Sequence, residues 1–309
     1  MTLAKLRLPR PGFPFSAPTT PHGVEPPAEK KRTGIDYETE WARSFPARWA
    51  RTVLLESVVR PSVRLLADPD REGLDRLHDL AQSDPVQPII FAANHHSHID
   101  TPLLLSSIPE PWRYQLFVGA AADYFFKTRA TSAASALVLN AIPIERTKVN
   151  RRSADDAAEL IDDGWSMVIF PEGGRSPDGW GQPFRGGAAY LAIRCGVPVV
   201  PVHLEGTGRI LRKGKKTPSR SRTRVTFGVP LWPNADDDSR RMAVRIERAV
   251  AALADETVTD WYTARVRAHS GVSPSLAGPD APGWRRAWAL GDRSPKRRRA
   301  TKRKWPKLD

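Results

Sequence analysis

Cysteine is almost absent from this chain of 309 residues, in which Cys195 is the only one. A single cysteine cannot form an intramolecular disulfide, and it excludes cysteine-based zinc fingers and CxxC redox motifs. Nothing in the sequence therefore requires an oxidising compartment.

Long apolar runs are also missing. A membrane-spanning helix needs about 20 mostly apolar residues. The best candidate, residues 133–144, is shorter and contains Asn140 and Pro143. Near the N-terminus, prolines within residues 9–14 interrupt any apolar stretch of a secretory signal. These absences predict a cytoplasmic protein that is soluble or peripheral, on the inner face of the cell membrane.

Acidic residues are too few to balance the basic ones, since 34 Asp and Glu face 48 Lys and Arg, which gives a net charge of +14. Residues 284–309 hold eleven Lys or Arg and two Asp, so +9 of this charge belongs to the C-terminal tail. An anionic membrane surface or a nucleic acid would suit that tail. Its tryptophans suit either partner, but no nucleic-acid-binding motif is visible.

Composition divides the chain into four parts. Residues 1–34 are rich in proline and basic residues and are predicted to be disordered. Residues 35–67 predict an amphipathic helix, because large apolar side chains recur at every fourth position. Residues 68–270 predict the folded domain, and residues 271–309 predict a basic, disordered tail. The apolar positions of the helix are Trp41, Phe45, Trp49 and Val53. Two interpretations of this helix stay open: it packs on the core, or it lies on a membrane surface.

The central domain alternates strand-like and helix-like segments. This alternation predicts a single α/β domain with a mixed, largely parallel sheet that is flanked by helices. Prolines at 198 and 201 predict that their strand lies at an edge or contains a bulge. The predicted strands are residues 88–93, 114–119, 166–170, 197–204 and 224–229, and the helices between them include 153–161, 187–194 and 238–253.

Polar residues follow the first of these strands, as Asn94-His95-His96-Ser97-His98-Ile99-Asp100. In one interpretation His95 lies in a turn and acts as a general base, while Asp100 in the first turn of a helix points back and orients it. In the other, His96, His98 and Asp100 form the H-x-H-x-D core of a metal-dependent hydrolase.

Three further segments carry candidate binding residues, and two of them contain an arginine suited to phosphate. The strand-like segment 142–147 contains Arg146, and Phe170 begins the sequence Phe-Pro-Glu-Gly-Gly-Arg-Ser. Glycines in the second segment allow close backbone approach, and Arg175 offers a planar fork for phosphate. The third segment, residues 197–202, is apolar and rigid.

In this order, the four segments resemble the signature of the lysophosphatidic acid acyltransferase family of glycerolipid acyltransferases. The resemblance spans roughly residues 70–255 and begins with the N-H-x-x-x-x-D pattern at Asn94. It implies that a fatty acyl group moves from acyl-CoA or acyl carrier protein to the hydroxyl of a lysophospholipid, with 1-acyl-glycerol-3-phosphate as the leading acceptor. No metal and no cofactor is implied.

The resemblance also implies roles for individual residues. His95 is the base and Asp100 orients it. Arg146 and Arg175 bind the acceptor phosphate, in a pocket that is shaped by Glu172, Gly173 and Gly174. Gly174 departs from the family, which has threonine or serine there, and this keeps open an acceptor with a different headgroup, such as a glycolipid.

Overall fold

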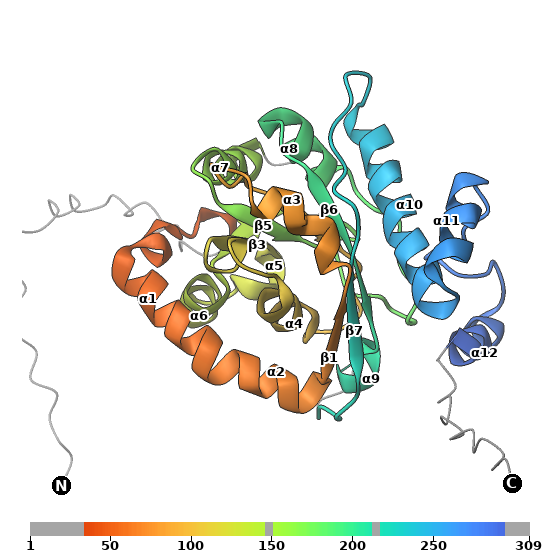
Figure 1. The fold of residues 1–309 in the computed structure, drawn as a ribbon. Coiled ribbons are helices and arrows are strands. Elements are labelled where there is room, and N and C mark those ends of the chain that lie inside the picture. The colour runs from red at the N-terminus through yellow and green to blue at the C-terminus, as the bar shows by residue number, and fades with distance from the viewer. Residues whose placement is uncertain (1–33, 146–150, 212–216, 294–309) are drawn as a thin grey trace, which may run out of the picture. The chain divides into compact units, whose positions relative to one another are not determined.

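The computed structural model describes residues 34–145, 151–211 and 217–293 (Figure 1). These residues contain a seven-stranded sheet in the order β1-β7-β6-β2-β5-β3-β4. Neighbouring strands are parallel, except that β6 and β7 are antiparallel. The mixed, largely parallel sheet that the sequence predicts is therefore confirmed. The strands are β1 (Pro69–Glu72), β2 (Ile90–Ala93), β3 (Leu116–Ala121), β4 (Ala141–Ile144), β5 (Ser166–Ile169), β6 (Val199–Glu205) and β7 (Thr223–Phe227).

Helices cover both faces of the sheet. Alternate residues of β2 show why this is needed, because Phe91 packs in one apolar cluster and Ile90 in the other. The first cluster includes residues of α2 and α4, and the second includes residues of α7, α8 and α10. The helices are α1 (Phe45–Leu54), α2 (Arg60–Ala67), α3 (His78–Ala81), α4 (Asp100–Ser107), α5 (Ala122–Phe125), α6 (Arg129–Leu139), α7 (Arg151–Asp162), α8 (Gly187–Cys195), α9 (Thr207–Leu211), α10 (Ser239–Val258), α11 (Trp261–His269) and α12 (Gly283–Arg293). No helix in the described ranges is long and apolar enough to span a membrane.

Of the two positions predicted for the proline-containing strand, the edge position is wrong, whereas an irregular, bulged position agrees with the pairing beside Pro201. β6 is central, between β2 and β7. Val202 pairs with Phe227, and the Gly228 amide donates to the Pro201 carbonyl at 2.8 Å. The register then shifts by one residue, since the next bridge joins Val199 to Leu231, so Pro201 lies beside an irregular part of the pairing. A Cβ on Gly228 would lie 2.6 Å from the Pro201 ring, so the glycine makes room for it.

The predicted N-terminal helix is shorter than expected. Helical structure is continuous from Phe45 to Ala67, with a π-helical turn at Leu55–Val59 between α1 and α2, whereas the preceding residues form short 3₁₀ turns. The helix packs on the core through small and aliphatic residues, among them Val63 and Ala67. Its predicted apolar row faces away from the core instead, with Phe45 81% and Trp49 65% exposed.

The C-terminal part also differs from the prediction of a disordered tail from residue 271. Residues 283–293 form α12, which is held against the loop at residues 176–181. The Asp178 carboxylate accepts from the Arg286 guanidinium at 2.8 Å, and the Trp180 indole donates to the Arg286 carbonyl at 3.0 Å. These contacts are 106 residues or more apart in sequence, so local composition does not reveal them. Residues 1–33 and 294–309, predicted as disordered, lie outside the described residues.

Candidate active site

The site forms where two neighbouring parallel strands end. β2 pairs with β5, and the loops that leave their carboxyl ends are residues 94–99 and 170–176. Ligands of open α/β sheets bind at this edge. The topology therefore brings together the two polar segments that the sequence places more than 70 residues apart.

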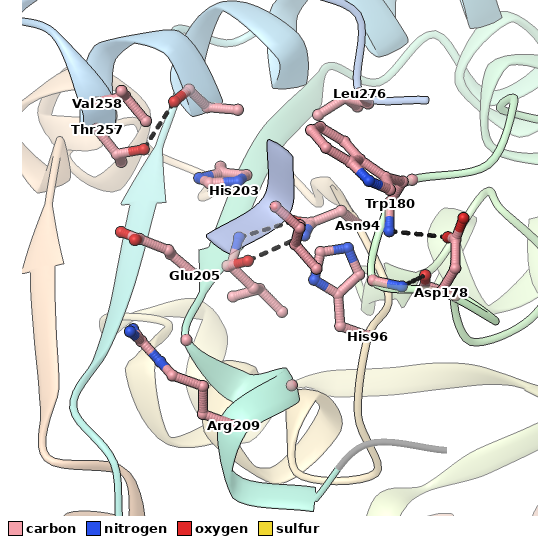
Figure 2. A pocket seen from close by; sticks show the side chains of 18 of the residues that line it. Asn94, His96, Asp178, Trp180, His203, Glu205, Arg209, Thr257, Val258 and Leu276 are labelled. Atoms are coloured by element: carbon pink, nitrogen blue, oxygen red, sulfur yellow. Dashed lines mark hydrogen bonds between the residues drawn. The ribbon is translucent and has the colours of Figure 1, made fainter. Parts of the chain in front are cut away.

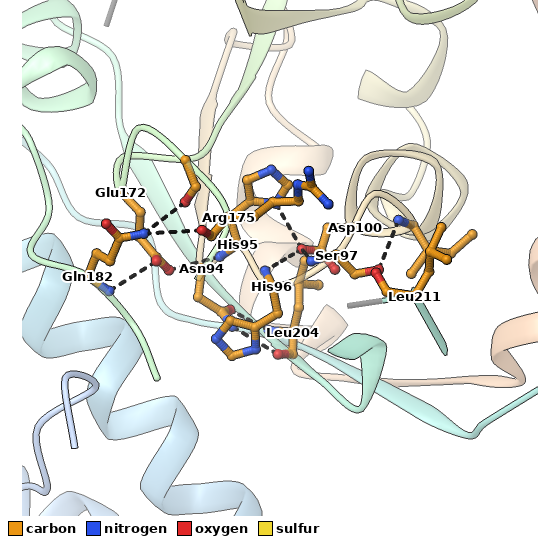
Figure 3. Close-up of polar contacts among 12 residues, drawn as sticks. Asn94, His95, His96, Ser97, Asp100, Glu172, Arg175, Gln182, Leu204 and Leu211 are labelled. Atoms are coloured by element: carbon orange, nitrogen blue, oxygen red, sulfur yellow. Dashed lines mark hydrogen bonds and ion pairs between the residues drawn. The ribbon is translucent and has the colours of Figure 1, made fainter. Parts of the chain in front are cut away.

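His95 and Asp100 are in direct contact (Figure 3), as the sequence predicts. The His95 Nδ1 atom lies 2.9 Å from the Asp100 Oδ2 atom. The same oxygen accepts from the backbone amides of His96 and Ser97, both at 2.7 Å. Asp100 begins α4 and is completely buried. Burial alone would raise the pKa of its carboxyl, but the hydrogen bond and charge of His95, with smaller contributions from Thr207 and His96, together outweigh burial and lower it. A charged Asp100 thus favours the His95 tautomer with hydrogen on Nδ1, which leaves Nε2 to accept a proton.

The backbone and ring of His95 are held from three sides. Its amide donates to the Glu172 Oε1 atom at 2.8 Å, and its carbonyl accepts from the Ser176 amide at 2.8 Å. Its ring stacks on Phe170 with centroids 4.2 Å apart. Since Phe170, Glu172 and Ser176 all follow β5, this loop fixes the position of the histidine.

Glu172 is buried and uses both carboxylate oxygens on backbone amides. Besides the His95 amide, it accepts from the Gln182 amide at 3.0 Å. Burial raises the pKa of Glu172 to about 7, against the pull of these two amides. The structure thus gives Glu172 a definite contact, as a link between the loop of His95 and residue 182.

This raised pKa predicts a pH-dependent stability. The folded protein holds a proton on Glu172 from about pH 4.5 to pH 7, whereas the unfolded chain has released it. Stability therefore falls as pH rises through this window, by roughly 3 kcal/mol for this group. Glu172→Gln cannot titrate and lacks this pH-dependent contribution. The difference in the free energy of unfolding, wild type minus variant, should therefore fall as the pH rises from 5 to 8. Urea denaturation at several pH values measures it, and a constant difference would contradict the prediction.

Arg175 is half-buried and lies beside the loop at residues 94–99, which is called the histidine loop below. Within the described ranges no carboxylate forms an ion pair with its guanidinium. Figure 3 shows Arg175 next to His95. Burial and the nearby charge of Arg175 lower the pKa of His98, whose Nε2 atom lies 3.0 Å from the Tyr124 hydroxyl. An uncompensated guanidinium at this place attracts an anionic ligand.

Of the remaining predicted site residues, the structure describes the two glycines but not Arg146. Gly173 has φ of +72°, and a Cβ there would lie 2.9 Å from the Arg185 side chain, so the position needs glycine. The Gly174 carbonyl accepts from the Gln182 side chain at 3.3 Å. Arg146 lies outside the described residues.

The candidate ligands of the metal-site interpretation do not converge in the structure. No group of three His, Cys, Asp or Glu converges in the part of the chain that the structure describes. His98 pairs with Tyr124, and the Asp100 oxygen that faces the loop is occupied by His95 and two amides. His96, His98 and Asp100 thus do not gather around one point.

The sequence analysis did not assign a role to several residues that position the loop at residues 94–99 through hydrogen bonds. The Asn94 side chain donates to the Leu204 carbonyl at 2.9 Å and accepts from the Leu204 amide at 2.7 Å, so it ties the end of β2 to β6. The Ser97 hydroxyl donates to the Leu211 carbonyl at 2.7 Å. Asn94 opens the N-H-x-x-x-x-D pattern, which gave a hint of its importance, but no pattern marks Gln182.

Comparisons with known proteins agree with this geometry. A family model described as Acyltransferase matches residues 75–205. A chloroplastic 1-acyl-sn-glycerol-3-phosphate acyltransferase of Brassica napus is 34% identical over 172 residues, which are 54% of this chain and 47% of that protein. The 1-acyl-sn-glycerol-3-phosphate acyltransferase alpha of Ovis aries is 25% identical over 57% of this chain and 61% of its own length.

The fold has a solved counterpart. The crystal structure of the 1-acyl-sn-glycerophosphate acyltransferase PlsC from Thermotoga maritima matches with a TM-score of 0.55 and 25% identity, over 72% of this chain and 86% of that one. The chain spans about half the length of the first curated relatives it matches, 47% and 48%. Sequence, site geometry and fold agree in one likeness: residues 75–205 match the Acyltransferase family model, and the chain is similar to 1-acyl-sn-glycerol-3-phosphate acyltransferases.

Proposed function

We propose that this protein transfers a fatty acyl group from a thioester, of coenzyme A or of acyl carrier protein, to the free hydroxyl of 1-acyl-glycerol-3-phosphate. The observation that carries the proposal is the 2.9 Å contact between the His95 Nδ1 atom and the buried Asp100 carboxylate. The relatives support the acceptor, since they are 1-acyl-sn-glycerol-3-phosphate acyltransferases.

In the proposed mechanism His95 is a general base. Its Nε2 atom takes the proton of the acceptor hydroxyl while the hydroxyl oxygen attacks the thioester carbonyl carbon. The tetrahedral intermediate then collapses, the carbon–sulfur bond breaks, and the protonated Nε2 returns the proton to the leaving thiolate. Asp100 stabilises the imidazolium that exists between these steps. The step needs no metal and no covalent acyl-enzyme.

A direct assay tests the function. Thiol release from acyl-CoA and from acyl carrier protein should depend on added 1-acyl-glycerol-3-phosphate and should yield phosphatidic acid. Monoacylglycerol and a lyso-glycolipid serve as alternative acceptors. Preference for either would favour the second acceptor class that Gly174 leaves open. No thiol release with any donor and acceptor would refute acyl transfer.

Arg175 is proposed to bind the phosphate of the acceptor. Loss of a hydrogen bond to a charged group costs about 1.5–3 kcal/mol. Arg175→Ala should therefore raise KM for 1-acyl-glycerol-3-phosphate by about 10- to 100-fold and change kcat less. The matched control is Arg194→Ala, which removes an exposed arginine on α8. An unchanged KM in Arg175→Ala would rule out phosphate binding by this residue.

Membrane association is proposed to use the outer side of α1. Phe45 and Trp49 lie one turn apart and are both exposed, and arginines flank them in the sequence. Such a face suits the boundary between lipid headgroups and acyl chains. The double variant Phe45→Ala/Trp49→Ala should lower partition into anionic vesicles about tenfold or more. Sedimentation with vesicles measures this, and equal partition of variant and wild type would contradict it.

A further inference from the structure

The inner side of α12 is fixed to the loop that follows Arg175. The Arg286 side chain pairs with Asp178, and its carbonyl accepts from Trp180. Leu290 packs over the same loop, because a Cβ on Gly179 would lie 2.5 Å from the Leu290 side chain. Three independent contacts thus give α12 one defined orientation.

Beneath α12 lies a cavity of about 1060 Å³ (Figure 2), bounded by Trp180, Leu276 and Leu290 on the side of the C-terminal segment and by His96 on the side of the histidine loop. The cavity and the loop at residues 176–181 adjoin the candidate active site, since the amide of Ser176 donates to the His95 carbonyl. The helix is therefore anchored next to the reacting groups.

The outer side of α12 is aromatic and uncovered. Trp284 and Trp288 are four residues apart, which places them on one face, and they are 68% and 70% exposed. The Arg285 guanidinium lies 5.1 Å from the Trp284 ring centroid. Two tryptophans that expose most of their surface side by side mark an interaction site rather than a structural element.

The chain that follows gives the charge of the partner. Residues 294–309 carry eight Lys or Arg against a single Asp, and they include Trp305. A basic segment directly after an aromatic helix face attracts an anionic surface, each Lys or Arg near it contributing about 1 kcal/mol. Tryptophan prefers the headgroup level of a bilayer, where its ring is half buried and its N–H stays hydrated.

We infer that the outer face of α12, formed by Trp284 and Trp288, docks on an anionic lipid bilayer. The choice of lipid over nucleic acid rests on the proposed function, because α12 is anchored beside a site whose substrates are membrane lipids. Docking there brings the bilayer next to the histidine loop. The surface is separate from the face of α1, and its sequence lies outside residues 75–205, which match the family.

Vesicle partition of the full chain tests this inference. Wild type should bind vesicles that contain phosphatidylglycerol, and high salt or pure phosphatidylcholine should weaken binding. Trp284→Ala/Trp288→Ala should lower the partition coefficient at least about tenfold, since burial of each aromatic side chain is worth about 1.5–3 kcal/mol when complete. The matched control is Trp261→Ala/Tyr262→Ala, which removes two exposed aromatic residues from α11 and should leave partition unchanged.

Three results would overturn the inference: equal partition of the α12 variant and wild type, equal losses in the α11 control, or displacement of the protein from vesicles by duplex DNA that binds more tightly. Partition requires no turnover, so it decides this inference even if the acyl transfer assay fails. Conversely, acyl transfer to monodisperse acceptor in the absence of vesicles should be the same in wild type and in Trp284→Ala/Trp288→Ala.

Discussion

His95→Ala is expected to lower kcat for acyl transfer by about 10²–10⁴-fold, because a positioned general base contributes this much to such a reaction. The acceptor hydroxyl is a weak nucleophile until its proton is removed, and His95, in contact with Asp100 at the sheet edge, is the proposed base. KM for the acceptor should change little, because the phosphate contact is assigned to Arg175. Initial rates of thiol release at saturating acceptor measure the effect.

The control for this variant is His269→Ala, which removes an exposed histidine from α11. Far-UV circular dichroism and thermal unfolding should show that His95→Ala is folded, since its ring is only partly buried and stacks on one side on Phe170. If His95→Ala retained the full rate while folded, the proposed base would be wrong, and the acid–base group would have to be sought elsewhere.

The sequence was sufficient for the parts of the molecule that depend on local pattern. Strand-like segments of five to eight residues predicted the positions of β2, β3, β5, β6 and β7, and one interpretation of His95 and Asp100 predicted a turn followed by a helix. The helix begins at Asp100, so the carboxylate lies in its first turn and faces back to the imidazole. Such short-range geometry follows from helix and strand periods.

Other features depend on contacts between distant segments, and the sequence did not reveal them. Pro201 lies in a central strand because Gly228, in a different part of the chain, leaves space beside it. α12 is held in place because Asp178 and Trp180 form hydrogen bonds with its residue Arg286. β1 was not predicted, since its sequence Pro-Asp-Arg-Glu lacks apolar residues and it forms a strand only by pairing with β7.

The direction of the N-terminal helix shows a third limit. A row of aromatic residues at every fourth position fits a buried face and a membrane-facing face equally well, because both are apolar. The structure shows that this row does not face the core, since the core contacts the smaller residues around Ala47 and Val63 and leaves Phe45 and Trp49 exposed; contact of the row with a membrane stays a prediction. Hydrophobicity alone gives the period of a helix but not its partner.

Asp100→Asn should be nearly as damaging as loss of the base, with kcat lowered about 10³-fold. The Asp100 Oδ2 atom lies within hydrogen-bond distance of three nitrogens, His95 Nδ1 and the amides of His96 and Ser97. An asparagine that keeps its oxygen toward the two amides has no charge to hold the imidazolium. If its NH₂ group faces Nδ1 instead, the proton moves to Nε2, and the histidine can no longer act as a base.

The stability of Asp100→Asn separates this role from a purely structural one. The folded-state pKa of Asp100 is lowered, so its contribution to stability is present above the unfolded-state pKa and is lost as pH falls through the folded-state pKa. The destabilisation of Asp100→Asn should therefore be complete at neutral pH and shrink in acid. Asp100→Glu keeps the charge but displaces it, and should recover part of that stability while kcat stays low. A variant with normal kcat and normal pH dependence would remove Asp100 from the mechanism, because no other carboxylate contacts the His95 ring in the described ranges.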